Sequence, residues 1–172
     1  MKALRLFLAV LFVSLFYSAA FSQDMQPPPP VQNSFFSAAI GTWKAEPYKM
    51  MGMEISNDQN VISMKHNGQF MVVEVDAIDG GGNNYTATIF TTIDGEGNVK
   101  GWAFDTWGYY GTMTYTGSAN GNTMTITGSN DFVNETRVMT IDGNKMTHDV
   151  DFTVKLPTGD MNEKLSIVYN KQ

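Results

Sequence analysis

The chain has 172 residues, a length typical of one domain with a sizeable core, and it contains no cysteine. Disulfide bonds and zinc sites built on thiolates are therefore excluded. Acidic residues number 17 against 11 basic ones, for a formal charge of -6. Such a chain, with no basic stripe, repels the phosphates of nucleic acids and anionic membranes, so we expect neither as a partner.

The first 22 residues have the layout of a secretory signal peptide. Lys2 and Arg5 precede an apolar run over residues 6–17, and small residues lead to a predicted cleavage point after Ser22. An apolar run of about a dozen residues is too short for a transmembrane anchor. We therefore expect a secreted or periplasmic protein. Without Lys2 and Arg5 it keeps 9 basic and 17 acidic residues, a charge of -8, and it has no cysteine for a lipid anchor.

Residues 23–36 are a predicted flexible linker. Four consecutive prolines, residues 27–30, favour a stiff, exposed polyproline II segment. A docking peptide for a proline-recognition domain is the alternative. Residues 34–40 are compatible with a short helical turn that leads into the first strand.

From residue 37 to 172 the sequence predicts one all-β domain. Short alternating segments rich in Thr, Val, Ile, Tyr and Phe are separated by Asn-Gly, Asp-Gly and Gly-rich turn signals. We expect about nine or ten antiparallel strands in an up-and-down barrel, with a sandwich as the alternative. Turns centred on residues 67–68 and 120–121 pair Met64 with Met71 and Tyr115 with Ile126. Apolar residues thus meet on one face of each hairpin.

The segment Gly41-Thr42-Trp43 opens the first predicted strand and resembles the G-x-W of calycin-type, lipocalin-like barrels. Residues 101–107, 112–128 and 165–169 are similar as well, and together they resemble a bacterial lipocalin-like domain family of unknown function over residues 38–171. The resemblance implies that Gly41 permits a tight turn and that Trp43 closes one barrel end. Haem-binding nitrobindin-type barrels have further glycines where this chain has residues 44–47, Lys-Ala-Glu-Pro, so we expect no haem and no other cofactor.

Two turn-like segments raise the question of metal binding. Residues 50–53, Met-Met-Gly-Met, have the soft thioethers that suit Cu(I), but they also fit a flexible apolar loop, which we favour. Residues 94–98, Asp-Gly-Glu-Gly-Asn, lack the distal glutamate of a calcium loop and fit a tight turn. We predict no metal site.

The candidate ligand-binding residues lie in the aromatic middle of the chain and in its last hairpin. On residues 145–156, His148 shares its face with apolar residues. With Asp142-Gly143 as a two-residue turn, Arg137 lies opposite His148, and an inward arginine would bind a carboxylate. A three-residue turn would instead pair Arg137 with Asp149 on the surface. Interior polar groups that only satisfy each other are the structural alternative.

Trp102 and Phe104 share a strand face and are predicted to line the cavity wall. The aromatic loop over residues 107–111 is predicted at the barrel mouth. The predicted ligand-binding set is therefore Arg137, His148, Trp102, Phe104, Tyr115 and Met139.

No catalytic motif is recognised, because a G-x-S-x-G elbow, a His-Glu-x-x-His helix and a cysteine nucleophile are all missing. We predict no catalytic residue, and the sequence favours a binding protein over an enzyme. The predicted function is capture of a small apolar or amphipathic molecule, with carboxylates as one candidate class, by a monomeric exported barrel. A filled barrel that serves as a structural or protein-interaction module is the main alternative, and an enzyme at the barrel mouth is a third.

Overall fold

The structure is a computed structural model that describes residues 27–172. The predicted signal peptide lies outside the described residues. The elements follow one another in this order: α2 (Ser34–Ala39), β1 (Gly41–Ala45), β2 (Tyr48–Met50), β3 (Met53–Lys65), β4 (Phe70–Ile78), β5 (Asn84–Ile93), β6 (Asn98–Asp105), the 3-10 turn η1 (Gly108–Tyr110), β7 (Met113–Asn120), β8 (Thr123–Ser129), β9 (Val133–Asp142), β10 (Lys145–Val154) and β11 (Met161–Lys171).

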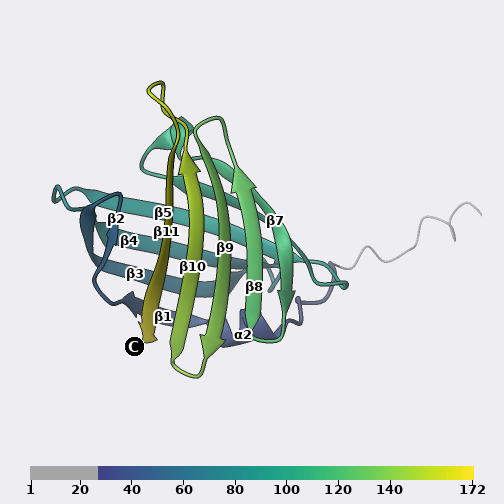
Figure 1. Cartoon of the computed structure of the whole chain (residues 1–172). Coiled ribbons are helices and arrows are strands. Elements are labelled where there is room, and N and C mark those ends of the chain that lie inside the picture. The colour runs from purple at the N-terminus through teal and green to yellow at the C-terminus, as the bar shows by residue number, and fades with distance from the viewer. Residues whose placement is uncertain (1–26) are drawn as a thin grey trace, which may run out of the picture.

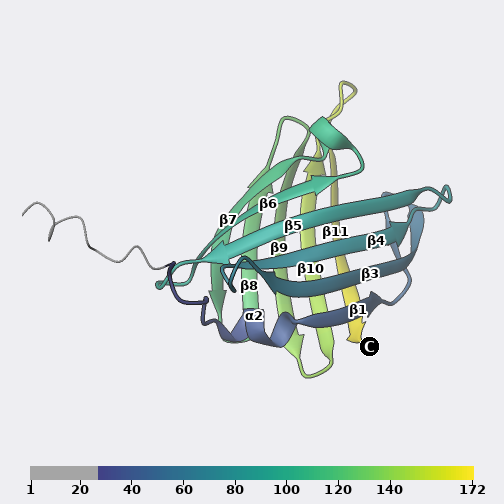
Figure 2. The ribbon, with the colours of Figure 1, turned by 180° about the vertical axis from the view of Figure 1, so that it is seen from behind.

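Ten of the eleven strands described in residues 27–172 close into an antiparallel barrel (Figures 1 and 2). Each strand from β3 to β11 pairs with its neighbour in sequence, and β1 pairs with both β3 and β11. The remaining strand, β2, forms a hairpin on β3 alone. The predicted up-and-down barrel is therefore confirmed, and the sandwich is wrong. Within residues 27–172, no helix is long and apolar enough to cross a membrane.

Helix α2 covers one end of the barrel (Figure 2). Asn33 caps the helix by accepting a hydrogen bond from the Phe36 amide, and Ser34 Oγ donates to the Gly121 carbonyl of the β7–β8 turn. Phe35 and Phe36 are both 1% exposed. Phe35 and Phe36, which the sequence placed in the linker, therefore belong to the core of the barrel domain.

The linker before α2 is held against the β3–β4 loop. Gln69 Nε2 donates to the carbonyl oxygens of Pro28 and Pro29, and the Val31 amide donates to the Gly68 carbonyl. These contacts bring the proline segment to the same barrel end as α2.

Trp43 is fully buried beneath α2, as the G-x-W resemblance implies. Its indole Nε1 donates to the Ala39 carbonyl at 2.7 Å, and Lys171 Nζ lies 5.0 Å from its ring centre. Gly41 has φ +136°, and a Cβ there would lie 2.8 Å from Lys171 Cε. The backbone conformation therefore requires glycine, whereas the close atom belongs to a flexible lysine side chain that can move.

Alternation places the faces of the strands as the sequence predicts. On β10, Met146, His148, Val150 and Phe152 are buried, whereas Asp149 and its neighbours of the same parity are exposed or partly exposed. A barrel strand presents every second side chain to the interior, so parity alone assigns these faces.

The hairpin registers agree with the sequence in one case and differ in two. The β3–β4 hairpin pairs Met64 with Met71 as predicted. In β7–β8, Tyr115 lies opposite Gly128 instead of Ile126, and in β9–β10 His148 lies opposite Met139 instead of Arg137. Both turns lie one residue later than predicted, over residues 121–122 and 143–144, because their glycines take positive φ at the first turn position. The pairing changes by two residues, which leaves every side chain on its predicted face.

Candidate functional site

Arg137 lies at the centre of a polar cluster on the inner face of the barrel. Its Nε donates to Glu135 Oε1 at 2.7 Å, and its Nη1 lies 3.4 Å from His148 Nδ1. Arg137 and His148 are thus diagonal neighbours across β9 and β10. Their predicted proximity inside the barrel is confirmed, although they do not lie directly opposite each other. The alternative pairing of Arg137 with Asp149 is wrong, because Asp149 faces outward opposite Val138.

His148 is a neutral imidazole with a defined tautomer. It is 4% exposed, and burial and the nearby Arg137 charge hold its pKa well below the usual 6.5. A guanidinium only donates, so His148 Nδ1 must accept, and the ring proton is therefore on Nε2. This Nε2 is buried and has no hydrogen-bond partner in the described part of the chain.

Asp58 is the functional candidate that the sequence reasoning missed. Asp58 continues the inward face of β3 beside a bulge between Ser56 and Gln59, where Asn57 has φ +54°, and it is 4% exposed. Its Oδ2 accepts from the hydroxyls of Tyr48 and Tyr169, at 2.8 and 2.7 Å.

Burial raises the pKa of Asp58 above its usual range, and its two tyrosine hydrogen bonds and the Arg137 charge offset this increase only in part. Among residues 27–172, Asp58 Oδ1 has no hydrogen-bond partner. The alternation along β3 would have predicted that Asp58 points inward. Asp58 and Asn60 are spaced by two residues and lie on the same face as Ile62 and Met64.

Closure of the barrel brings Asp58 close to His148. Tyr169 lies opposite Ala45, the last residue of β1, and its hydroxyl reaches Asp58 on β3. The ring of Tyr169 packs against the imidazole of His148, with 4.7 Å between ring centres. Asn60, 3% exposed, lies two residues beyond Asp58, and its Oδ1 likewise has no partner within residues 27–172.

Buried tyrosines surround the charged groups. Burial raises the pKa of Tyr48, Tyr85, Tyr115 and Tyr169, so each keeps its hydroxyl proton and can donate. Tyr115, predicted as a ligand-binding residue, is 8% exposed inside the barrel. Its ring lies over Gly128, where a Cβ would come within 2.5 Å of the ring. Met139, from the same predicted set, is also buried, beside Arg137 in β9.

Trp102 and Phe104 do not line the interior, so this part of the prediction is wrong. They are 37% and 49% exposed on the outer face of β6, and Gly101 and Ala103 take the inner positions. The small inner residues leave room for Tyr115, which lies opposite Gly101 on β7. Sequence reasoning placed the large aromatic residues inside because aromatic side chains are most often buried.

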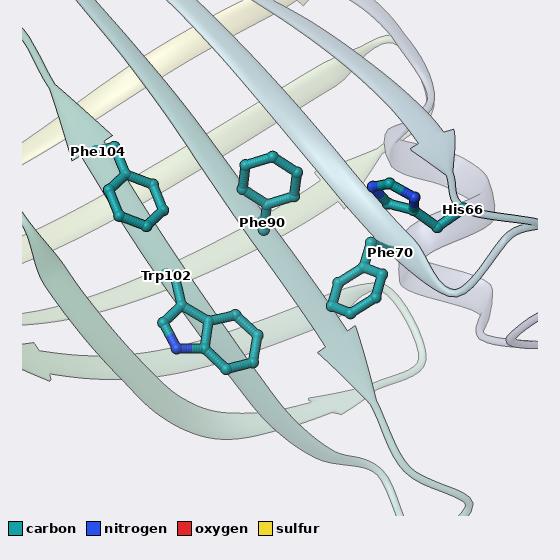
Figure 3. A pocket seen from close by; sticks show the side chains of 5 residues that line it. All are labelled: His66, Phe70, Phe90, Trp102 and Phe104. Atoms are coloured by element: carbon teal, nitrogen blue, oxygen red, sulfur yellow. The ribbon is translucent and has the colours of Figure 1, made fainter.

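The outward aromatic residues form a groove of about 310 Å³ on the surface of the barrel. Figure 3 shows its lining, which consists of His66, Phe70, Phe90, Trp102 and Phe104. The Phe70 and Trp102 ring centres lie 6.4 Å apart, and His66 meets Phe70 edge to face at 5.8 Å. We name this feature the outer aromatic groove. It is separated from the polar cluster by the wall of the barrel.

The aromatic loop over residues 107–111 lies at the barrel end away from α2 (Figure 2). Trp107 and Tyr109 are 69% and 74% exposed. Tyr110 packs edge to face on Phe132 with 4.7 Å between ring centres, and Asn130 Nδ2 donates to the Tyr110 carbonyl. The loop therefore lies at the mouth as predicted, and its role in ligand entry remains a prediction.

The methionine segment forms a tight hairpin. Met50 pairs with Met53, and Met51 and Gly52 make the turn with positive φ. In the described part of the chain, no group of three or more His, Cys, Asp or Glu residues is arranged to hold a metal ion. Asp94 closes its own turn by accepting hydrogen bonds from the amides of Glu96 and Asn98.

No protein-family model matches the chain, and a search of curated proteins finds no match. Among solved structures, the chain is similar to the S-type phycobiliprotein lyase CPES from Guillardia theta. The TM-score is 0.56 at 10% identity, over 80% of this chain and 91% of that one. It is also similar to EF1p2_mFAP2b bound to DFHBI, with a TM-score of 0.50 at 9% identity, over 81% of this chain and 98% of that one. At such identities the similarity shows the fold alone, a closed lipocalin-like barrel.

Proposed function

We propose that this protein binds a small hydrophobic or amphipathic molecule inside the barrel, with the polar end of the molecule at the cluster around Arg137. The supporting observation is that three buried polar atoms of this cluster, Asp58 Oδ1, Asn60 Oδ1 and His148 Nε2, have no partner among the described residues. A buried polar atom without a hydrogen bond costs about 1–3 kcal/mol. A bound molecule that pairs with these atoms would recover that free energy.

Two further features are compatible with this proposal. One similar barrel is described as bound to DFHBI, so the fold accommodates a small molecule in at least that protein. The residues Gly41 and Trp43 also support the narrower proposal of a place in the bacterial lipocalin-like family. A monomer is proposed as well, because every strand of the closed barrel already has two neighbours.

A protein-interaction module with a filled barrel is the second candidate, and the outer aromatic groove favours it. Exposed apolar surface of this kind often marks a contact site for another protein. The two candidates place binding on opposite sides of the barrel wall, so they can be separated by experiment.

The test combines native mass spectrometry of protein purified from its own host with titration of the neutral dye Nile red. We expect a co-purified small molecule or saturable dye binding, and we expect the outer-face variant Trp102→Ser/Phe104→Ser to retain it. Loss of dye binding in that variant would place the binding in the outer aromatic groove. No co-purified molecule and no dye binding would support the filled barrel.

A further inference from the structure

Within residues 27–172, the buried carboxylate of Asp58 has no ion-pair partner. Arg137 forms its ion pair with Glu135, at 2.7 Å. Asp58 is hydrogen-bonded only to the neutral hydroxyls of Tyr48 and Tyr169, and burial and the Arg137 charge keep His148 uncharged. A buried carboxylate is strongly destabilising unless a cation or several hydrogen bonds compensate its charge.

The unpaired atoms also define what a ligand must supply. Asp58 Oδ1 and Asn60 Oδ1 are both acceptors, so they require donors. His148 Nε2 carries a proton, so it requires an acceptor. Asp58 and His148 both contact Tyr169, and Asn60 lies two residues along β3 from Asp58. A carboxylate ligand would supply acceptors only and would add a second negative charge beside Asp58.

We propose that the interior site recognises a protonated amine, which donates to Asp58 Oδ1 and Asn60 Oδ1, on a molecule with an apolar body. This inference rests on the proposed function and specifies its ligand class. An ammonium group has three donors and no acceptor, which suits the two unpaired oxygens. An oxygen atom near the amine would accept from His148 Nε2. The carboxylate class suggested by Arg137 is disfavoured, because Glu135 already occupies the guanidinium Nε.

The test compares decylamine, decanol and decanoic acid, which share one apolar chain and differ in the head group, by isothermal titration calorimetry on the full mature protein. We expect decylamine to bind at least about tenfold more tightly than decanoic acid, the size of one charged hydrogen bond. Equal binding, or tighter binding of the acid, would overturn the amine inference and leave the proposed function standing. If none of the three binds and the protein also fails to bind Nile red, the proposed function fails together with this inference.

Two inner-face variants should change the preference in opposite directions. Asp58→Asn is expected to weaken decylamine binding by about tenfold or more, with little change for decanol. Glu135→Gln releases Arg137 and is expected to strengthen binding of decanoic acid. Unchanged decylamine affinity in folded Asp58→Asn protein would contradict the proposal.

The matched control is Asp151→Asn. Asp151 is half exposed on the outer face and pairs with Lys164 at 2.6 Å. The Asp151→Asn substitution removes the same charge from the protein without changing the interior. The affinities for decylamine, decanol and decanoic acid should therefore stay at the wild-type values. If Asp58→Asn does not fold, the wild-type comparison and Glu135→Gln still decide the question.

Discussion

Three tryptophans occupy three environments, and burial determines what each one does. Trp43 is fully buried, Trp102 is 37% exposed on the barrel wall, and Trp107 is 69% exposed at the mouth. Only Trp43 has its indole N–H satisfied by a carbonyl within the core. Residue type therefore indicates what a side chain can contribute, and its position relative to the barrel wall decides whether it packs the core, lines the groove or contacts solvent.

The neutral state of His148 leads to a prediction on pH. Its pKa is lower in the folded chain than the usual 6.5, so the folded state binds fewer protons than the unfolded state. This contribution to stability is present above about pH 6.5 and is lost as the pH falls toward the folded pKa. We expect urea denaturation of wild-type protein and His148→Gln to show a smaller loss of unfolding free energy on acidification in the variant.

The control is the same pair of proteins compared between about pH 8 and 9, where residue 148 binds no proton in either the folded or the unfolded chain. The difference in unfolding free energy between them should not change with pH in that range. Identical pH profiles for wild-type protein and His148→Gln would show that His148 is not held neutral by the fold.

At the scale of elements, turns and glycines determine how the strands approach one another. The β3 bulge lies beside the inward Asp58, and Gly128 leaves space for the ring of Tyr115. Among the strand glycines of residues 27–172, Gly117 has the least room next to main-chain atoms: a Cβ there would lie 1.9 Å from the Thr125 carbonyl oxygen. Main-chain atoms cannot rotate away as a flexible side chain can, so this position permits only glycine without a shift of β8.

Gly117→Ala is therefore expected to destabilise the barrel by about 1–3 kcal/mol or more, as overpacking of a close-packed interior does. Gly95→Ala provides the control, because no atom lies within 4 Å of the added Cβ and Gly95 needs no positive φ. Chemical denaturation of both variants measures the difference. Equal stabilities would mean that β7 and β8 separate without cost at Gly117.

At the scale of the whole molecule, the two ends of the barrel have different characters. One end is sealed by α2 and Trp43 and packed with apolar side chains. Glu135 and Arg137 lie in the first half of β9, which starts beside the aromatic loop, where Tyr110 packs on Phe132. This ion pair is therefore nearer to the mouth than to the end that α2 covers.

Export remains a proposal, and it predicts a defined mature protein. Expression of the full chain in a bacterial host should give a secreted or periplasmic product. Its intact mass should equal that of a chain beginning at Gln23. Replacing Leu8 and Leu11 by Asp interrupts the apolar run and should retain the uncleaved chain in the cell. An unprocessed chain in the cytoplasm of cells that express the wild-type sequence would contradict the proposal.

The sequence by itself determined the β class, the barrel, and the inward faces of Arg137 and His148. These features follow from alternation and turn signals, which are local, and a register error of two residues does not change a face. The place of Trp43 at a barrel end was implied only by the resemblance to barrels with a G-x-W segment. Alternation also predicts that Trp102 points outward and that Asp58 points inward. For Trp102, the expectation that aromatic residues are buried led to the opposite prediction.

Only the tertiary structure decided which polar groups meet. Closure of the barrel through β1 brings Tyr169 of the last strand to Asp58 of the third, although the two are 111 residues apart in sequence. Arg137 pairs with Glu135, two residues away on the same face of β9, and within residues 27–172 Asp58 has no ion-pair partner. The contact between Tyr169 and Asp58 depends on the shape of the closed sheet, and no local pattern in the chain encodes it.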